Sequence, residues 1–252
     1  MEIVRLRADQ IIEASEMLAR AFQDDPAWEW VLPSARRRAA LLPWLFRVNF
    51  EVTDAEPWTT VGDVRGCARW VAPGPPQMHV GPMLRALVAT PVRLREATQR
   101  FFAYGRAVEG MRVSASPGPH WYLAGIGVDS GSRRQGIGTA LLEPGIRHSQ
   151  EDKVPCTLLT NNEENVAFYA KRGFEVVQEG RTPAEGPRAW VMHRRPVTSD
   201  HPTGISSGLS GKSCALWTSE NQAGLGRRER PYPKVWARPR TTACAGLQPS
   251  RG

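Results

Sequence analysis

The sequence lacks an apolar run of about 18 residues, the length that a bilayer-spanning helix needs. Its first ten residues carry four charged side chains where a secretory signal would need an apolar stretch. Cysteine is scarce, and the wide spacing argues against a CxxC metal pair and against a dense disulfide framework. We therefore expect a soluble, cytoplasmic protein with free thiols, no metal and no membrane partner. The four cysteines are Cys67, Cys156, Cys214 and Cys244.

Positive charge is concentrated at the carboxyl end. The net charge is +8, and residues 197–252 hold eight Lys and Arg against three Asp and Glu, which leaves +5 in that segment. The same 56 residues contain only seven Ile, Leu, Val or Phe, too few to offset the entropy of ordering the chain. We expect one domain at 1–196 and a disordered basic tail at 197–252 with no part in the chemistry.

Two explanations of the tail stay open. A nonfunctional extension, for example from a reading-frame artefact, accounts for its composition. The alternative is an RNA contact through Trp217, Tyr232 and Trp236 beside clustered Arg and Lys. Nucleic acid is not an expected partner of the remaining chain.

Helical and strand patterns alternate through the first 196 residues, which predicts an α+β or α/β architecture. The stretch between the first two helices, which includes Trp28 and Trp30, is expected to be a loop. Strand patterns occupy 2–6, 58–61, 66–71, 120–128 and 157–160, with two more beside Gly186-Pro187. Helical patterns occupy 11–22, a stretch from Pro33 through Val48, 83–111 with a break at Pro91, 137–149 and 166–171.

Between residues 121 and 142, a strand pattern runs into a glycine-rich turn and then a helix start. The N–H groups and dipole of such a helix start form an anion site, and Gly136 and Gly138 let the backbone approach phosphate oxygens closely. Arg133 and Arg134 add positive charge. The third glycine of a GxGxxG dinucleotide motif is absent, and no Gly-Lys-Ser/Thr of a Walker loop follows. The segment predicts a phosphate site outside those two classes.

Two signatures in this order resemble the GCN5-related N-acetyltransferases (GNAT). Arg133-Arg-Gln-Gly136-Ile-Gly138 looks like the family's R/Q-x-x-G-x-G/A turn, and Asn165-Val-Ala-Phe-Tyr169-Ala-Lys-Arg-Gly173-Phe174 looks like its second signature. The segment 185–192 and the pair Pro144-Gly145 are similar to the puromycin N-acetyltransferase branch. The resemblance implies the GNAT acyl-CoA N-acyltransferase fold, a central mixed sheet flanked by helices, with splayed strands at the CoA site.

The resemblance also implies acetyl-CoA as co-substrate. Backbone N–H groups of the glycine turn would hold its pyrophosphate, bordered by the Arg133 side chain. The strand at 126–128 would pair with the pantetheine arm like an added edge strand, and an N–H near Ile126 would polarise the thioester carbonyl. Gly125 and Gly127 suggest the bulge that splays this strand. The predicted cofactor-binding residues are Ile126, Gly127, Val128, Arg133, Arg134, Gly136, Ile137, Gly138, Thr139 and Asn165.

Transfer from a thioester to an amine needs an acid for the departing thiolate. Tyr169 is the predicted catalytic residue, because a phenol is protonated at neutral pH and can donate to sulfur. The alternative is that Phe168 and Tyr169 only pack in the core.

The proton acceptor is left open. The puromycin-like pattern can carry a carboxylate immediately before Thr160, but this chain has Leu159 there. Glu163 and Glu164 are more typical of a helix start, and His120 of a strand end. A relay through water is a further alternative.

Asp25 and Trp28 are the predicted acceptor-binding residues, because an acid beside aromatic rings suits a cationic amine; a purely structural loop is the alternative. We expect direct acetyl transfer to a primary amine of a small molecule, since neither Cys67 nor Cys156 has an identifiable His partner. Antibiotic resistance by acetylation of an aminonucleoside would fit. A protein or peptide amine, or a non-catalytic acyl-CoA sensor, are the alternatives. The protein is expected to be a monomer or a homodimer.

Overall fold

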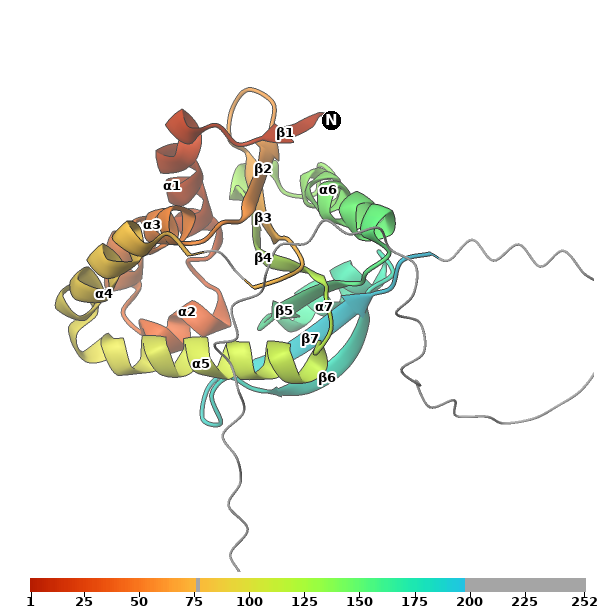
Figure 1. Cartoon of the computed structure of the whole chain (residues 1–252). Helices are drawn as coiled ribbons and strands as arrows, with labels where there is room; N and C mark the ends of the chain where they lie inside the picture. The colour runs from red at the N-terminus through yellow and green to blue at the C-terminus, as the bar shows by residue number, and fades with distance from the viewer. Residues whose placement is uncertain (76–77, 198–252) are drawn as a thin grey trace, which may run out of the picture. The chain divides into compact units, whose positions relative to one another are not determined.

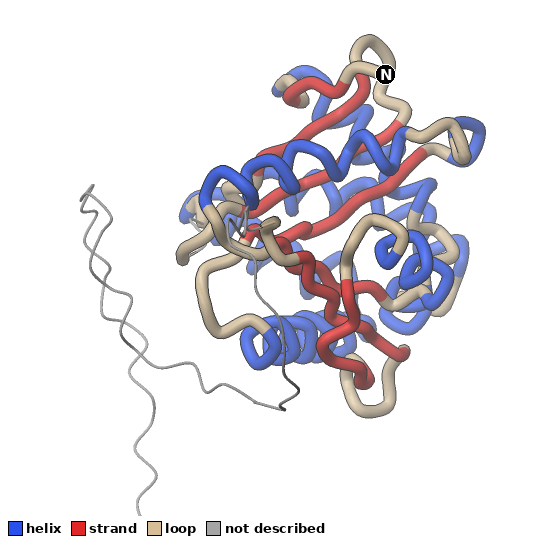
Figure 2. The backbone as a smooth tube through the Cα atoms, turned by 90° about the vertical axis from the view of Figure 1, so that its right-hand side faces the viewer, coloured by secondary structure: helices blue, strands red, loops and turns tan. Residues whose placement is uncertain are grey.

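The computed structural model describes residues 1–75 and 78–197, so the prediction for the tail lies almost wholly outside the described residues. One seven-stranded mixed sheet runs through this part in the order β1-β2-β3-β4-β5-β7-β6 (Figures 1 and 2). Only β4 and β5 pair in parallel; every other pair is antiparallel. The strands are β1 (Ile3–Arg5), β2 (Glu56–Thr60), β3 (Gly66–Val71), β4 (Trp121–Val128), β5 (Cys156–Thr160), β6 (Glu175–Arg181) and β7 (Arg188–Arg194).

Seven α-helices of the described chain surround the sheet, and α1 and α6 lie on opposite sides of it (Figure 1). Two glycines in the paired strands β3 and β4 support this placement of the helices. A Cβ at Gly127 would lie 2.8 Å from Leu18 of α1, and one at Gly66 would lie 2.7 Å from Ile137 of α6. The helices are α1 (Ile11–Ala21), α2 (Pro26–Val31), α3 (Ala35–Val52), α4 (Val80–Leu94), α5 (Thr98–Ala115), α6 (Ile137–Asp152) and α7 (Glu163–Ala170).

Strands β4 and β5 separate along their length. Residues 121–123 of β4 pair with 156–158 of β5, after which β4 continues to Val128 without a β5 partner. The register between β3 and β4 shifts between Leu123 and Gly125, so the bulge is at Ala124. The expected splaying is present, and the bulge includes Gly125, which with Ala124 stands opposite Arg69. The expectation that Gly127 takes part in the bulge was wrong, because Gly127 pairs regularly with Cys67. Gly127 is small because α1 packs on it.

Two details of the helices also differ from expectation. The predicted loop between the first two helices contains α2, which begins because Asp25 accepts the Ala27 N–H at 3.0 Å and Pro26 presets the first helical φ. Pro91 does not break its helix. Proline has no N–H to donate to the Leu87 carbonyl one turn earlier. Because Leu87 is 57% exposed, water can hydrogen-bond to that carbonyl instead. The break falls at Arg95, whose φ is 51°.

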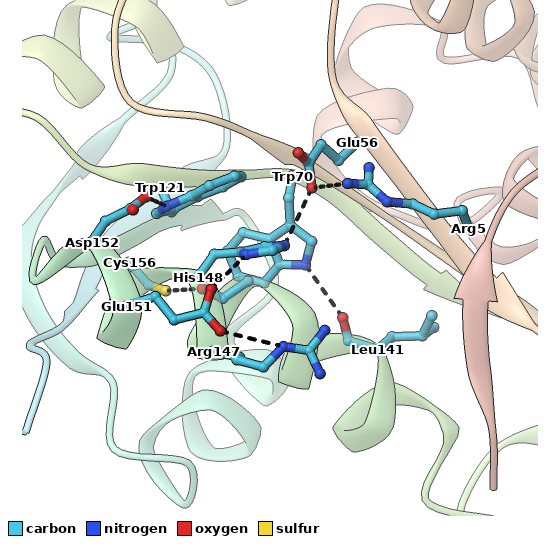
Figure 3. A network of polar contacts seen from close by, with 11 residues as sticks. Arg5, Glu56, Trp70, Trp121, Leu141, Arg147, His148, Glu151, Asp152 and Cys156 are labelled. Carbon is cyan, nitrogen blue, oxygen red and sulfur yellow. Dashed lines mark hydrogen bonds and ion pairs between the residues drawn. The ribbon is translucent and has the colours of Figure 1, made fainter. Parts of the chain in front are cut away.

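The buried side chain of Trp70 lies on the α6 side of the sheet (Figure 3). The Trp70 indole N–H donates to the Leu141 carbonyl at 3.3 Å, and a Cβ at Gly145 would lie 2.2 Å from the Trp70 ring. Beside it, His148 stacks on Trp121 with ring centroids 4.8 Å apart. The sheet is therefore covered by packed side chains around Trp70. The cavities described next lie where β4 separates from β5.

Candidate active site

Two cavities meet where β4 leaves β5. A groove of about 700 Å³ follows the glycine turn and the start of α6. A chamber of about 600 Å³ lies among β4 and helices α2 to α5. Five residues line both cavities, and we call this set the junction: Phe22, Asp25, Ile126, Asn165 and Tyr169.

The groove has the features of an anion site. Gly136, at φ 81°, precedes the first residue of α6, so the first-turn N–H groups have no partner within the helix. Arg134 also has a positive φ, at 63°, which gives the turn its tight shape. All ten predicted cofactor-binding residues line this groove. Their chemistry fits a pyrophosphate, although their role in binding stays a prediction.

Arg172 lines the groove too, and we did not predict it. Its Nε donates to the Thr139 hydroxyl at 3.0 Å, and its guanidinium lies 3.6 Å from the centroid of the Phe168 ring. The residue is inside the second signature, but one arginine at a helix end carries no sequence signal for a ligand. Only the packing of α7 beside α6 places its charge at the glycine turn.

The far half of β4 presents backbone groups to the groove. Ile126, Gly127 and Val128 pair with β3 on one edge, and on the other edge no described strand is paired with them. Unpaired backbone groups of a strand are able to bind an extended ligand by adding it to the sheet. This edge runs to the junction through Ile126.

The chamber is mainly aromatic. Trp28 stands between Phe46 and Phe101, with ring centroids 5.9 and 6.4 Å from its own. Asp25 and Trp28, the predicted acceptor-binding residues, line the chamber, whereas the neighbouring Asp24 lines only the groove. Trp30 lines neither cavity and lies under the Arg100 guanidinium. The sequence could not show which of the two tryptophans lines the chamber, because that depends on the position of α2.

The junction holds a carboxyl and a phenol with altered proton affinities. Burial raises the pKa of Asp25 to about 6, against an opposing effect of backbone N–H groups. Burial, then the charge of Asp25, raises the pKa of Tyr169, and the same two causes raise that of Tyr104. Tyr104 donates to Asn161 at 2.8 Å. The Tyr169 hydroxyl has no hydrogen-bond partner among the described residues.

Other groups considered for proton transfer lie away from the chamber. His120 is buried against the Gly118 carbonyl and Arg112, and lines neither cavity. Glu163 is near Arg188, and Glu164 lines only the groove. Leu159 does line the chamber, so the position of the puromycin-like carboxylate is apolar here.

The two described cysteines are not poised for nucleophilic attack. Burial raises the pKa of the Cys67 thiol to about 12 and that of Cys156 to about 11. Neither thiol lines the junction. An acyl-cysteine relay is therefore not supported by these two residues.

The described part of the chain lacks two further features. No three His, Cys, Asp or Glu side chains there are grouped so that they would hold a metal ion. No helix there combines the length and apolar character needed to cross a membrane.

Residues 88–174 match the model of the acetyltransferase (GNAT) family. Among solved structures, the histone acetyltransferase HPA2 and related acetyltransferase from Corynebacterium glutamicum is similar at 19% identity, covering 79% of this chain and 98% of its own, with a TM-score of 0.55. The ribosomal-protein-S18-alanine N-acetyltransferase from Escherichia coli is 18% identical over 81% of this chain and 99% of its own, with a TM-score of 0.43. Naa20 from Chaetomium thermophilum, in complex with a bisubstrate analogue, is 14% identical over 78% and 87%, with a TM-score of 0.42.

The family match covers the glycine turn, β4, β5 and α7, which supply most of the groove lining and three of the five junction residues. Phe22 and Asp25 of the junction lie outside the match. The Corynebacterium structure shares the arrangement of the sheet and its helices. The chain therefore has the GNAT fold, and the match over residues 88–174 supports an acyl-CoA-dependent N-acetyltransferase.

Proposed function

We propose that this domain transfers the acetyl group of acetyl-CoA to the primary amine of a small molecule with an apolar or aromatic body. The observation that carries this proposal is the chamber. Its volume of about 600 Å³ is that of a site for a drug-sized ligand, and aromatic side chains line it. It opens to the groove at the junction, where a bound amine would meet the thioester.

Acetyl-CoA fits the groove in three respects. The α6 N-terminus and its glycine turn suit the pyrophosphate, and Arg133, Arg134 and Arg172 supply positive charge nearby. The unpaired edge of β4 suits the amides of the pantetheine arm. When bound, the co-substrate supplies an activated acetyl group, which the arm would carry to Ile126 and Tyr169.

Tyr169 is the proposed acid. It lies in both cavities, its hydroxyl is free of hydrogen bonds among the described residues, and its raised pKa keeps it protonated at physiological pH. A protonated phenol at the junction can donate to the sulfur as the carbon–sulfur bond breaks. Its place in the lining of both cavities favours a role beyond core packing.

A protein or peptide amine is the second candidate acceptor, because the similar protein from Corynebacterium glutamicum is described as a histone acetyltransferase and related acetyltransferase. A chain segment would have to enter the chamber end first. The aromatic lining favours a compact apolar body over a polar peptide backbone. The puromycin-like relationship, a role in antibiotic resistance and a cytoplasmic location stay predictions.

The test uses the full chain. Acetyl-CoA binding is measured by isothermal titration, and thiol release is measured with puromycin, 2-phenylethylamine, and peptides with a free α-amine or a lysine. Binding with turnover of the compact amines supports the proposal. Turnover of peptides alone shifts the acceptor to protein, and binding without turnover of any amine supports a sensor. Absence of acetyl-CoA binding would contradict the assignment of the groove.

A further inference from the structure

Direct transfer requires a group that takes a proton from the amine, because a primary amine is an ammonium ion at neutral pH and has no free lone pair. The described lining of the chamber contains no His, Lys, Arg or Glu. Asp25 is the one carboxylate in that lining. The residue also belongs to the junction, where the amine nitrogen must sit to attack.

We propose that Asp25 is the base of this reaction, a role that rests on the proposed function. Its carboxylate is held in place by the start of α2, where Oδ1 accepts the Ala27 N–H at 3.0 Å. A base fixed by a helix start loses little conformational freedom when the substrate binds. The same loop places Asp24 on the groove side only, so position 25 alone combines a carboxylate with the chamber.

The electrostatic surroundings suit an incoming cation. No Lys or Arg among the described residues forms an ion pair with Asp25. Glu29 lies one turn further along α2, and Tyr104 from α5 and Tyr169 from α7 face the same carboxylate. A half-buried acid that faces an acid and two phenols gains more from an ammonium than one that already has a cation.

The proton inventory balances with Asp25 and Tyr169 alone. Asp25 takes one proton from the ammonium, and the freed lone pair forms the carbon–nitrogen bond at the thioester carbonyl. The carbon–sulfur bond then breaks, and Tyr169 gives its proton to the sulfur. The second nitrogen proton restores Tyr169, and Asp25 releases its proton to water. The products are the acetamide, the CoA thiol and one proton.

Asp25 could instead act only as the cap of α2 or only as an anchor for the ammonium. Asp25→Asn separates these roles, since Asn caps a helix about as well as Asp but cannot take a proton. A lost anchor raises KM with kcat unchanged, whereas a lost base lowers kcat. Glu29→Gln is the matched control, because it removes the neighbouring carboxylate of α2, which is 52% exposed and paired with Arg38.

The experiment follows kcat and KM from pH 5 to 8.5 for wild type, Asp25→Asn, Asp25→Glu and Glu29→Gln. Acetyl-CoA is the donor, and 2-phenylethylamine, or the panel amine turned over fastest, is the acceptor. We expect Asp25→Asn to lower kcat by about 100-fold or more while acetyl-CoA binding stays within about twofold. The wild-type fall in kcat/KM below about pH 6 should vanish in Asp25→Asn and persist in Glu29→Gln.

Three results would overturn the assignment. One is an Asp25→Asn variant that keeps kcat within about threefold of wild type, and another is a rise in KM alone. The third is a wild type that acetylates no amine. That last result contradicts the proposed function itself, and the role of Asp25 falls with it. Partial recovery of kcat in Asp25→Glu, with an acid limb restored, would support the base and exclude a loss caused by misfolding.

Discussion

Asp25 and Tyr169 line the same junction although they are far apart in the sequence. Asp25 comes from the start of α2 and Tyr169 from α7. Burial raises the pKa of both groups, and the charge of Asp25 adds to the effect on Tyr169. A carboxylate ready to accept a proton therefore faces a phenol that retains one. This pair lies in the lining of both the chamber and the groove.

Replacing Tyr169 by Phe should lower kcat by about 100-fold, because the thiolate would leave without a proton donor. Acetyl-CoA affinity should stay within about twofold, since the ring and its packing remain. Thiol release and titration calorimetry measure the two quantities.

Tyr104→Phe is the matched control for that change. It removes a phenol from the same chamber, but one that already donates to Asn161. We expect a stability loss of about 1 to 2 kcal/mol and a kcat within several-fold of wild type. Equal losses of kcat in both variants would contradict a specific role for Tyr169.

Asp25 should also reduce stability at neutral pH. A carboxyl whose pKa rises from 3.8 unfolded to about 6 folded binds more protons when folded, so the stability of the fold decreases as pH rises through that window. Asp25→Asn removes this cost. Its stability should match wild type near pH 4 and exceed it by up to about 3 kcal/mol above pH 7.

Urea unfolding at several pH values measures that difference. A stability gain that accompanies a loss of kcat would identify Asp25 as a residue kept for function at the expense of folding. A difference that does not change with pH would show that its pKa is not raised in the folded protein.

Gly136→Ala should weaken acetyl-CoA binding about tenfold or more. A Cβ at this position, with φ 81°, strains the turn by about 1 to 2 kcal/mol and adds a methyl group to the turn that is proposed to hold the pyrophosphate. Gly62→Ala provides the control, since its φ is 77° and it lines neither cavity. Similar loss of binding in both variants would mean that strain alone, and not the phosphate contact, is responsible.

Gly145→Ala should destabilise the fold by about 3 kcal/mol or more, because the added methyl would lie 2.2 Å from the rigid Trp70 indole. Gly110→Ala adds the same methyl to a helix where nothing lies within 4 Å. That control should gain about 0.5 to 1 kcal/mol from helix propensity. Thermal and urea unfolding of both variants check the contrast, and a tolerated Gly145→Ala would show that α6 can shift away from β3.

The features of this protein that depend on local geometry could be predicted from its sequence. The glycine turn, the helix start after it and the second signature are continuous stretches, and a resemblance carried by them predicted the GNAT fold and the ten groove residues. Helix α2 escaped prediction because a short helix depends on one cap and on packing, and the bulge at Ala124 because register depends on the neighbouring strand.

The surroundings of the proposed amine site could not be predicted from the sequence. The cavity combines residues from three helices: Asp25 and Trp28 from α2 and its start, Phe101 from α5, and Tyr169 from α7. No pattern along the chain indicates that they share one cavity. The proton affinity of Asp25 likewise arises from burial, which a residue acquires only when the rest of the fold closes around it. The proposed phosphate site thus depends on a local turn, whereas the proposed acceptor site depends on how helices pack on a splayed sheet.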